Sequence, residues 1–147
     1  MGLDIFIYET TNVTTDDKGR SVETRVQLDN LHNCHNFLNV LDRKRDGGFT
    51  NNATLVFYEG EIFSALADLK EDLKTYENGT AYRFPSDTDE HFNARMQQEQ
   101  SEYKSEIAVI EKFIKENNLQ EQAPTEEDEE YGVDDQYGRE FEINAWW

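Results

Sequence analysis

Side chains that can ligate a metal lie close together within one stretch of seven residues. Asp29, His32 and His35 recur at intervals of three residues, and Cys34 lies between the two histidines. On a helix this spacing brings two imidazoles near one face, where zinc could bind with a further ligand such as His91. The spacing matches no established metal-binding signature, so a partly buried histidine that hydrogen-bonds to a backbone carbonyl is the favoured interpretation. We therefore predict no metal and no cofactor, and keep a small metal protein or enzyme centred on His32, His35 and His91 as the alternative.

Motifs of enzyme nucleophiles and of calcium loops are missing from the sequence. It contains no G-x-S-x-G, C-x-x-C or H-E-x-x-H motif and no glycine-rich phosphate loop. The calcium-loop pattern fails whether it is started at Asp42 or at Glu127, because the required ligand positions hold other residues. Carboxylate pairs for acid–base catalysis carry no information in a chain with 32 acidic residues. We predict a protein that is not an enzyme and has no catalytic residues.

Negative charge is the strongest global feature of the chain. Its 147 residues include 32 Asp and Glu against 14 Lys and Arg, a formal net charge of −18. Such a field repels nucleic acids and anionic membranes, so direct binding to either is not expected. The one basic cluster, Arg43-Lys44-Arg45, lies where a predicted helix ends and matches the helix dipole. The expected partner is a protein with a basic surface.

Rows of carboxylates recur on the longest predicted helix and near the C-terminus. At helical or extended spacing they can stand in for the phosphates of a duplex, which carries about one charge per 1.7 Å of axis. The alternative is a solvated acidic surface that only keeps the protein soluble. The predicted partner-binding residues are Glu99, Glu102, Glu106, Glu126, Glu127, Asp128, Glu129, Glu130, Asp134 and Asp135.

The order of predicted elements indicates an α+β fold. An N-terminal hairpin, with its first strand covered on both faces, precedes a helix over 28–45; a strand over 53–58 and a helix over 60–76 follow. Residues 80–84 could add a short strand. The longest helix is expected near 86–117, capped by Ser86 or Asp87. We predict a mixed or mainly antiparallel sheet with about three helices.

The last residues of the chain should form a strand rather than a free tail. Phe141, Ile143, Ala145 and Trp147 alternate on one face from about residue 139 onward. Burial of two such side chains contributes several kcal/mol at about 25 cal/mol per Å². We therefore expect this strand to pair near the N-terminal one, within a single domain over 1–147. The acidic segment at about 120–138 then becomes a loop held at both ends.

The N-terminus and the cysteine content indicate the compartment. The sequence MGLDIFIYET has no basic region before an apolar stretch, so neither a signal peptide nor a membrane span is expected. Cys34 is the single cysteine, which suits a reducing environment. We expect a cytoplasmic protein, inside the host cell if it is phage-encoded.

The opening residues MGLDIFIY resemble the start of a group of small phage and prophage proteins of unknown function. Those proteins begin Met-Gly-Leu-Asp followed by an aromatic, strand-like run. The resemblance implies a phage context, in which small acidic proteins block host nucleic-acid machinery such as CRISPR and restriction enzymes. The leading hypothesis is a non-catalytic, phage-type inhibitor of this anti-CRISPR or anti-restriction kind, which binds a basic surface of a host nucleic-acid-binding factor. A structural protein that self-associates through the edge of its C-terminal strand is a further alternative, and the oligomeric state stays open.

Overall fold

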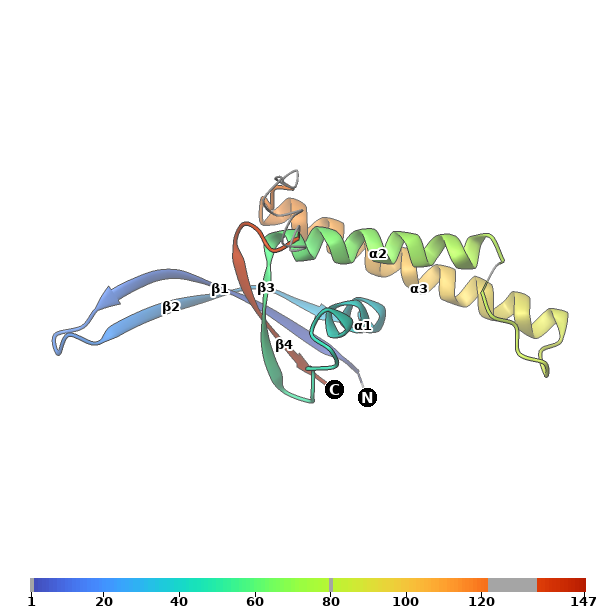
Figure 1. Cartoon of the computed structure of the whole chain (residues 1–147), viewed down its shortest axis with the longest axis horizontal. Coiled ribbons are helices and arrows are strands. Elements are labelled where there is room, and N and C mark those ends of the chain that lie inside the picture. Colours follow the sequence, from blue (N-terminus) through green and yellow to red (C-terminus); the bar gives the residue numbers. More distant parts are fainter. Residues whose placement is uncertain (1, 80, 122–134) are drawn as a thin grey trace.

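A computed structural model describes residues 2–79, 81–121 and 135–147, and it confirms the predicted α+β class. Three helices pack against an antiparallel sheet of four strands (Figure 1). No helix in this part of the chain is long and apolar enough to cross a membrane. The elements are β1 (Asp4–Thr15), β2 (Ser21–His32), α1 (His35–Lys44), β3 (Ala53–Tyr58), α2 (Glu59–Glu77), α3 (Asp89–Glu116) and β4 (Glu140–Trp146).

The C-terminal strand β4 lies in the interior of the sheet. The strand order is β2-β1-β4-β3, and every neighbouring pair is antiparallel. Ile143 of β4 lies opposite Ile7 of β1 on one side and Leu55 of β3 on the other. The predicted pairing of the last residues with the N-terminal strand is confirmed. Self-association through an exposed edge of this strand is therefore the wrong hypothesis, because both of its edges are paired.

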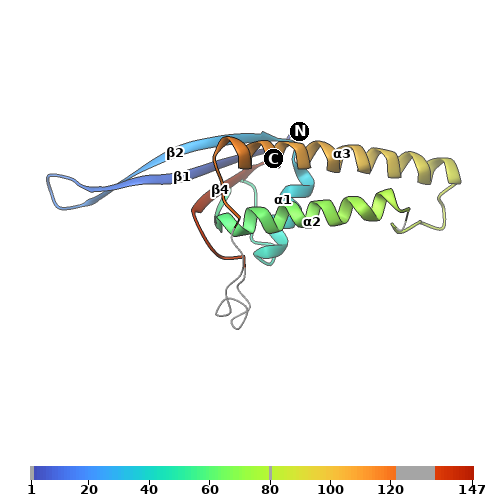
Figure 2. The same ribbon diagram turned by 90° about the horizontal axis from the view of Figure 1, so that it is seen from above.

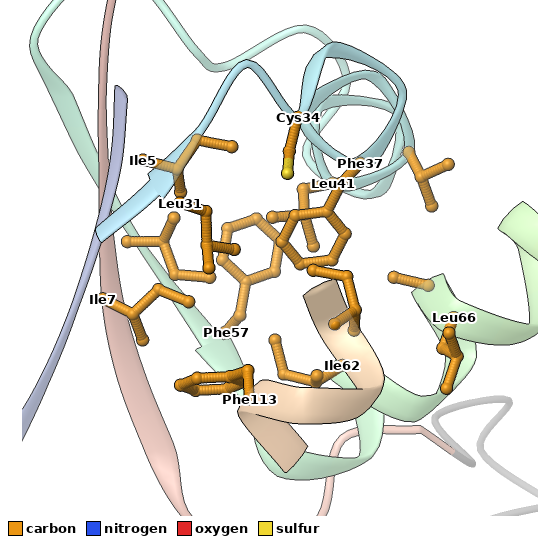
Figure 3. Packing of buried hydrophobic residues seen from close by; sticks show 14 of the residues in the cluster. Ile5, Ile7, Leu31, Cys34, Phe37, Leu41, Phe57, Ile62, Leu66 and Phe113 are labelled. Atoms are coloured by element: carbon orange, nitrogen blue, oxygen red, sulfur yellow. The ribbon is translucent and has the colours of Figure 1, made fainter. Parts of the chain in front are cut away.

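The hydrophobic core lies between one face of the sheet and the three helices. Ile7 from β1 and Phe141 and Ile143 from β4 are fully buried on that face, as the alternation of the sequence predicts. The helices contribute their apolar stripes, including Phe37 of α1 and Phe113 of α3 (Figure 3). These aromatic rings bury large apolar areas and compensate for the low hydrophobic fraction of the chain.

The second face of the sheet is open to solvent, contrary to the expectation that β1 is covered on both faces. Phe6 and Tyr8 alternate with the buried residues of β1 and are only partly buried. On the same face, Val56 of β3 is 45% exposed and Trp146 of β4 is 46% exposed. The apolar residues on both faces of β1 therefore indicated a half-covered antiparallel strand rather than a central strand with two covered faces.

Strand β2 extends into a segment that the spacing of its leucines predicts to be helical. Leu28 and Leu31 are three residues apart, but both belong to β2, and the helix begins only at His35. The register shifts between Ile7 and Tyr8, which leaves Leu28 as the extra residue of a β-bulge. Because of the bulge, the inward-facing residues Leu28 and Leu31 are three positions apart instead of two, which is also the spacing expected on a helix. His35 consequently lies at the helix start, exposed, rather than on the apolar stripe.

Helices α2 and α3 form an antiparallel pair that extends beyond the sheet on one side (Figures 1 and 2). The predicted apolar stripe of α2 is confirmed, because Ile62 and Leu69 are fully buried. Thr88, and not Ser86 or Asp87, caps α3: its hydroxyl accepts a hydrogen bond from the backbone N–H of His91 at 3.1 Å. Residues 81–84 are not a strand but part of the connection between the two helices.

The distal part of the β1–β2 hairpin extends away from the helices on the opposite side. Figures 1 and 2 show it as a two-stranded ribbon that reaches past the rest of the sheet. All side chains from Ser21 to Gln27 are exposed, in contrast to Leu31, which is 2% exposed. The hairpin is thus part of the core at one end and surrounded by solvent at the other.

Candidate interaction surface

The predicted row of carboxylates on α3 is not one continuous exposed face. Glu102 is exposed, Glu99 is partly buried, and Glu106 is buried, with a relative solvent exposure of 6%. Burial raises the pKa of Glu99, and the neighbouring Glu102 carboxylate adds to this effect. The expectation that Glu106 displays its charge on the surface is wrong, because it points into the protein instead.

Glu106 caps the N-terminus of α1. Its Oε1 accepts the backbone N–H of Phe37 at 2.8 Å and its Oε2 accepts the side-chain amide of Asn36 at 2.7 Å. Cys34 at the N-cap position makes no capping hydrogen bond, so the carboxylate from α3 supplies what α1 lacks. Burial raises the pKa of Glu106, and the hydrogen bonds from Phe37 and Asn36 oppose this rise. The residue therefore joins two helices rather than contacting a partner.

The acidic segment near the C-terminus is held at both of its ends by one buried side chain. Glu59, at the start of α2, is 4% exposed. Its Oε2 accepts the backbone N–H of Gln120 at 2.8 Å, and its Oε1 accepts the backbone N–H of Arg139 at 3.1 Å. Arg139 also accepts a hydrogen bond from the backbone N–H of Glu59 at 2.6 Å through its carbonyl oxygen. Gln120 and Arg139, which flank the acidic segment, are thus held at the same place on α2.

Two glycines permit this close approach. A Cβ on Gly60 would clash with the carbonyl oxygen of Asp135 and with the ring of Tyr137. Gly138 has a φ of +83°, a conformation that L residues with a side chain rarely adopt, and it packs directly against the Glu59 side chain. The backbone of the returning chain is therefore fitted closely to the first turn of α2.

Ion pairs fix the returning chain further. Arg139 donates to both oxygens of Glu9 at 2.7 Å and to the carbonyl oxygen of Asn117 at 2.6 Å. Asp135, a predicted partner-binding residue, binds the Lys44 ammonium at 3.1 Å. Its charge is therefore partly neutralised within the chain. The remaining predicted residues of the segment, Glu126, Glu127, Asp128, Glu129, Glu130 and Asp134, lie outside the described residues.

Most basic side chains of the described residues pair with carboxylates of the same chain. Within the described part of the chain, eleven of the 14 Lys and Arg residues form an ion pair with a carboxylate, each with a different partner. The cluster at 43–45 was predicted to be a surface that matches the dipole of α1, and it also joins elements. Arg45 binds both oxygens of Glu61, which is 1% exposed, and Lys44 binds Ser64 and Asp135. Few basic side chains are therefore left to neutralise the remaining carboxylates.

Only two of the three histidines of the alternative hypothesis lie near each other. His32 and His35 line one cavity of about 510 Å³ with Cys34, Glu102 and other residues. His91 is in the first turn of α3, about 15 Å along the helix from Ser101, the nearest α3 residue that lines that cavity. Among the described residues, no group of three or more His, Cys, Asp or Glu is placed to hold a metal ion.

Cys34 is a buried thiol with little tendency to ionise. Burial, with smaller contributions from the Glu106 and Asp29 carboxylates, raises the pKa of Cys34 to about 12. The thiol therefore stays protonated at neutral pH, whereas a nucleophilic cysteine needs the thiolate. Its side chain is part of the hydrophobic core (Figure 3).

Comparisons of the chain with the models of protein families, with curated proteins and with solved structures found no match. The residues described above thus carry the functional argument by themselves. Sequence reasoning missed Glu59, Arg139 and the capping role of Glu106. The partners of Glu59 are 61 and 80 residues away in the sequence, and no local pattern indicates such contacts.

Proposed function

We propose that this chain is a non-catalytic acidic protein that binds a basic surface of a nucleic-acid-binding partner. The resemblance of MGLDIFIY to phage proteins supports a partner in a host cell and a role as an inhibitor of the anti-CRISPR or anti-restriction kind. The observation that carries the proposal is the pair of hydrogen bonds that Glu59 accepts from Gln120 and Arg139, which we call the Glu59 clasp. One buried carboxylate binds Gln120 and Arg139, the described residues on either side of the most acidic segment, and these contacts support a role for that segment at one place on the surface.

The charge balance supports the same proposal. The ion pairs among the described residues involve eleven basic residues, and the net charge of −18 stays available for an electrostatic encounter. Complementary charge accelerates association and selects partners more than it adds affinity. A protein that normally binds phosphates presents the matching basic surface.

The test is a pull-down from bacterial lysate with the immobilised protein, followed by competition with duplex DNA. We expect a basic, nucleic-acid-binding protein to be captured at about 50 mM salt, to be released near 300 mM, and to be displaced by DNA. Binding that is unchanged between the two salt concentrations contradicts the proposal. So does a partner that binds DNA and this protein at the same time without competition.

A further inference from the structure

Strand β2 is the longer of the two end strands of the sheet in the described part of the chain, with 12 residues against 6 in β3. β2 is the end strand of the sheet, and its residues Ser21–Gln27 are all exposed. Val22 and Val26 are 43% and 41% exposed. The edge of the other end strand, β3, is partly covered by the Arg45 side chain, which donates to the carbonyl oxygen of Val56 at 2.9 Å. Natural proteins usually block a free edge with lysine, proline or a bulge. Residues 21–27 contain no lysine and no proline, and the register shift opposite Thr24 and Arg25 places its extra residue, Thr11, in β1 and not in β2.

The sequence of this edge is complementary to itself. The segment S-V-E-T-R-V-Q is nearly symmetric in chemistry about Thr24. Suppose that two copies of β2 pair antiparallel with Thr24 opposite Thr24. Val22 of each copy then lies opposite Val26 of the other copy. Glu23 of one copy then lies opposite Arg25 of the other, and this contact occurs twice because of the two-fold symmetry. Opposite charges and β-branched pairs directly across from each other are the favourable cross-strand combinations.

We propose that β2 is a self-association edge and that its occupant is the β2 strand of a second copy of this chain. The two hairpins would join their sheets through backbone hydrogen bonds across the two-fold axis at Thr24, the mode of strand addition. The shape of the molecule permits this contact, because the ribbon extends away from the helices (Figures 1 and 2). A two-stranded ribbon is marginally stable in water, and pairing converts it into four strands. This inference concerns a different surface from the acidic segment and is independent of the proposed function.

Charge reversal tests the pairing of Glu23 with Arg25. We expect the wild type to form a dimer in sedimentation equilibrium at about 0.15 M salt, where the repulsion between the acidic bodies is screened beyond about 8 Å. The substitution E23R sets two cations against each other, so the dimer dissociation constant should rise by at least about tenfold. D17R, which makes the same charge change in the hairpin turn, should leave the dissociation constant within about twofold of wild type.

Mixing two variants separates a lost pairing from a damaged hairpin. Arg25 also contacts Glu142 at 2.6 Å and the ring of Tyr8, so R25E alone could disturb the monomer. A mixture of E23R and R25E restores opposite charges at both contacts, although neither variant pairs with itself. We expect a heterodimer in the mixture and monomers in the separate samples.

A cross-link tests the register directly and needs no charge change. Cβ atoms that face each other in an antiparallel pair are about 4.5–5.5 Å apart, which a disulfide can span with small adjustment. T24C should therefore form a covalent dimer under mild oxidation, and the equally exposed S21C, opposite Gln27, should not. The native Cys34 is buried and should not contribute. A wild-type protein that stays monomeric at all concentrations overturns the proposal. A dimer that E23R does not weaken, or equal cross-linking of T24C and S21C, also overturns it.

Discussion

Removing the Glu106 carboxylate should loosen the start of α1. In E106A the backbone N–H of Phe37 and the amide of Asn36 lose their acceptor inside the protein. Hydrogen bonds to a charged group contribute about 1.5–3 kcal/mol to stability. The substitution also removes the desolvation cost of the buried carboxylate, which offsets part of this loss. We expect the free energy of unfolding of E106A to fall by about 2–3 kcal/mol. E106Q, which keeps one acceptor oxygen, should lose about 1 kcal/mol.

The assay is urea unfolding at pH 7, followed by circular dichroism. The matched control is E102A, because Glu102 lies on the same helix, one turn earlier, and is exposed. Exposed substitutions usually change stability by less than about 0.5 kcal/mol. If E106A and E102A unfold at the same urea concentration, the capping role of Glu106 is refuted.

The pH dependence of the same variants gives a second readout. Burial raises the pKa of Glu106 in the folded state above the value of the unfolded chain, about 4.3. The folded state therefore binds this proton more tightly, and the resulting stabilisation is fully present below the unfolded pKa. It is lost as the pH rises through the raised, folded-state pKa. The difference in stability between wild type and E106Q should consequently shift in favour of E106Q over that pH window, and a flat difference would contradict the assignment.

Three further outcomes are expected. G60A should lower stability by about 1–3 kcal/mol in thermal or urea unfolding, because the new methyl group meets the carbonyl oxygen of Asp135; stability equal to wild type would contradict the close fit at the clasp. R139K should destabilise by about 1–2 kcal/mol because a lysine cannot form the two-point contact with Glu9, and E9Q combined with R139K should add little more if the two residues act as a pair. Cys34 should react with a thiol reagent at pH 8 only as fast as the protein unfolds, since its pKa is raised to about 12; rapid labelling of the folded protein would exclude a buried, protonated thiol.

The elements that sequence reasoning predicted well are those with a long, uninterrupted period. The stripe from Ile62 to Tyr76 continues over several turns, and the helix over these residues was predicted nearly to its ends. The end of β2 was mispredicted because a single bulge at Leu28 changed the spacing of the apolar residues. The cap of α3 moved to Thr88 because Ser86, Asp87 and Thr88 all have suitable side chains, and only the path of the preceding chain selects one of them.

The site was predictable in its charge but not in its contacts. Composition and spacing indicated which residues carry negative charge, and Glu102 is exposed as expected. They did not indicate that Glu106 turns inward, because this depends on the start of a helix 69 residues away in the sequence. The role of Glu59 likewise follows from tertiary structure, since a glutamate in the first turn of a helix is common without any distant partner.

The central proposal is that the acidic segment between Gln120 and Arg139 binds the partner, and that the total negative charge of the chain is not sufficient. One variant replaces the acidic residues at 126–130 and 134 by Gln or Asn, and a second replaces an equal number of exposed carboxylates on α2 and α3. The second set is Asp68, Glu71, Glu77, Glu90, Glu111 and Glu116. The two variants have the same net charge, and the second also removes the exposed ion pairs of Glu71, Glu111 and Glu116.

The decisive measurement is the affinity of both variants for the captured partner, by isothermal titration calorimetry at about 0.15 M salt. We predict that neutralising the segment held by Glu59 weakens binding by at least about tenfold, whereas neutralising the helices weakens it by less than about threefold. Equal losses from both variants, or a larger loss from the helix variant, would contradict the claim that the position of the charge determines binding.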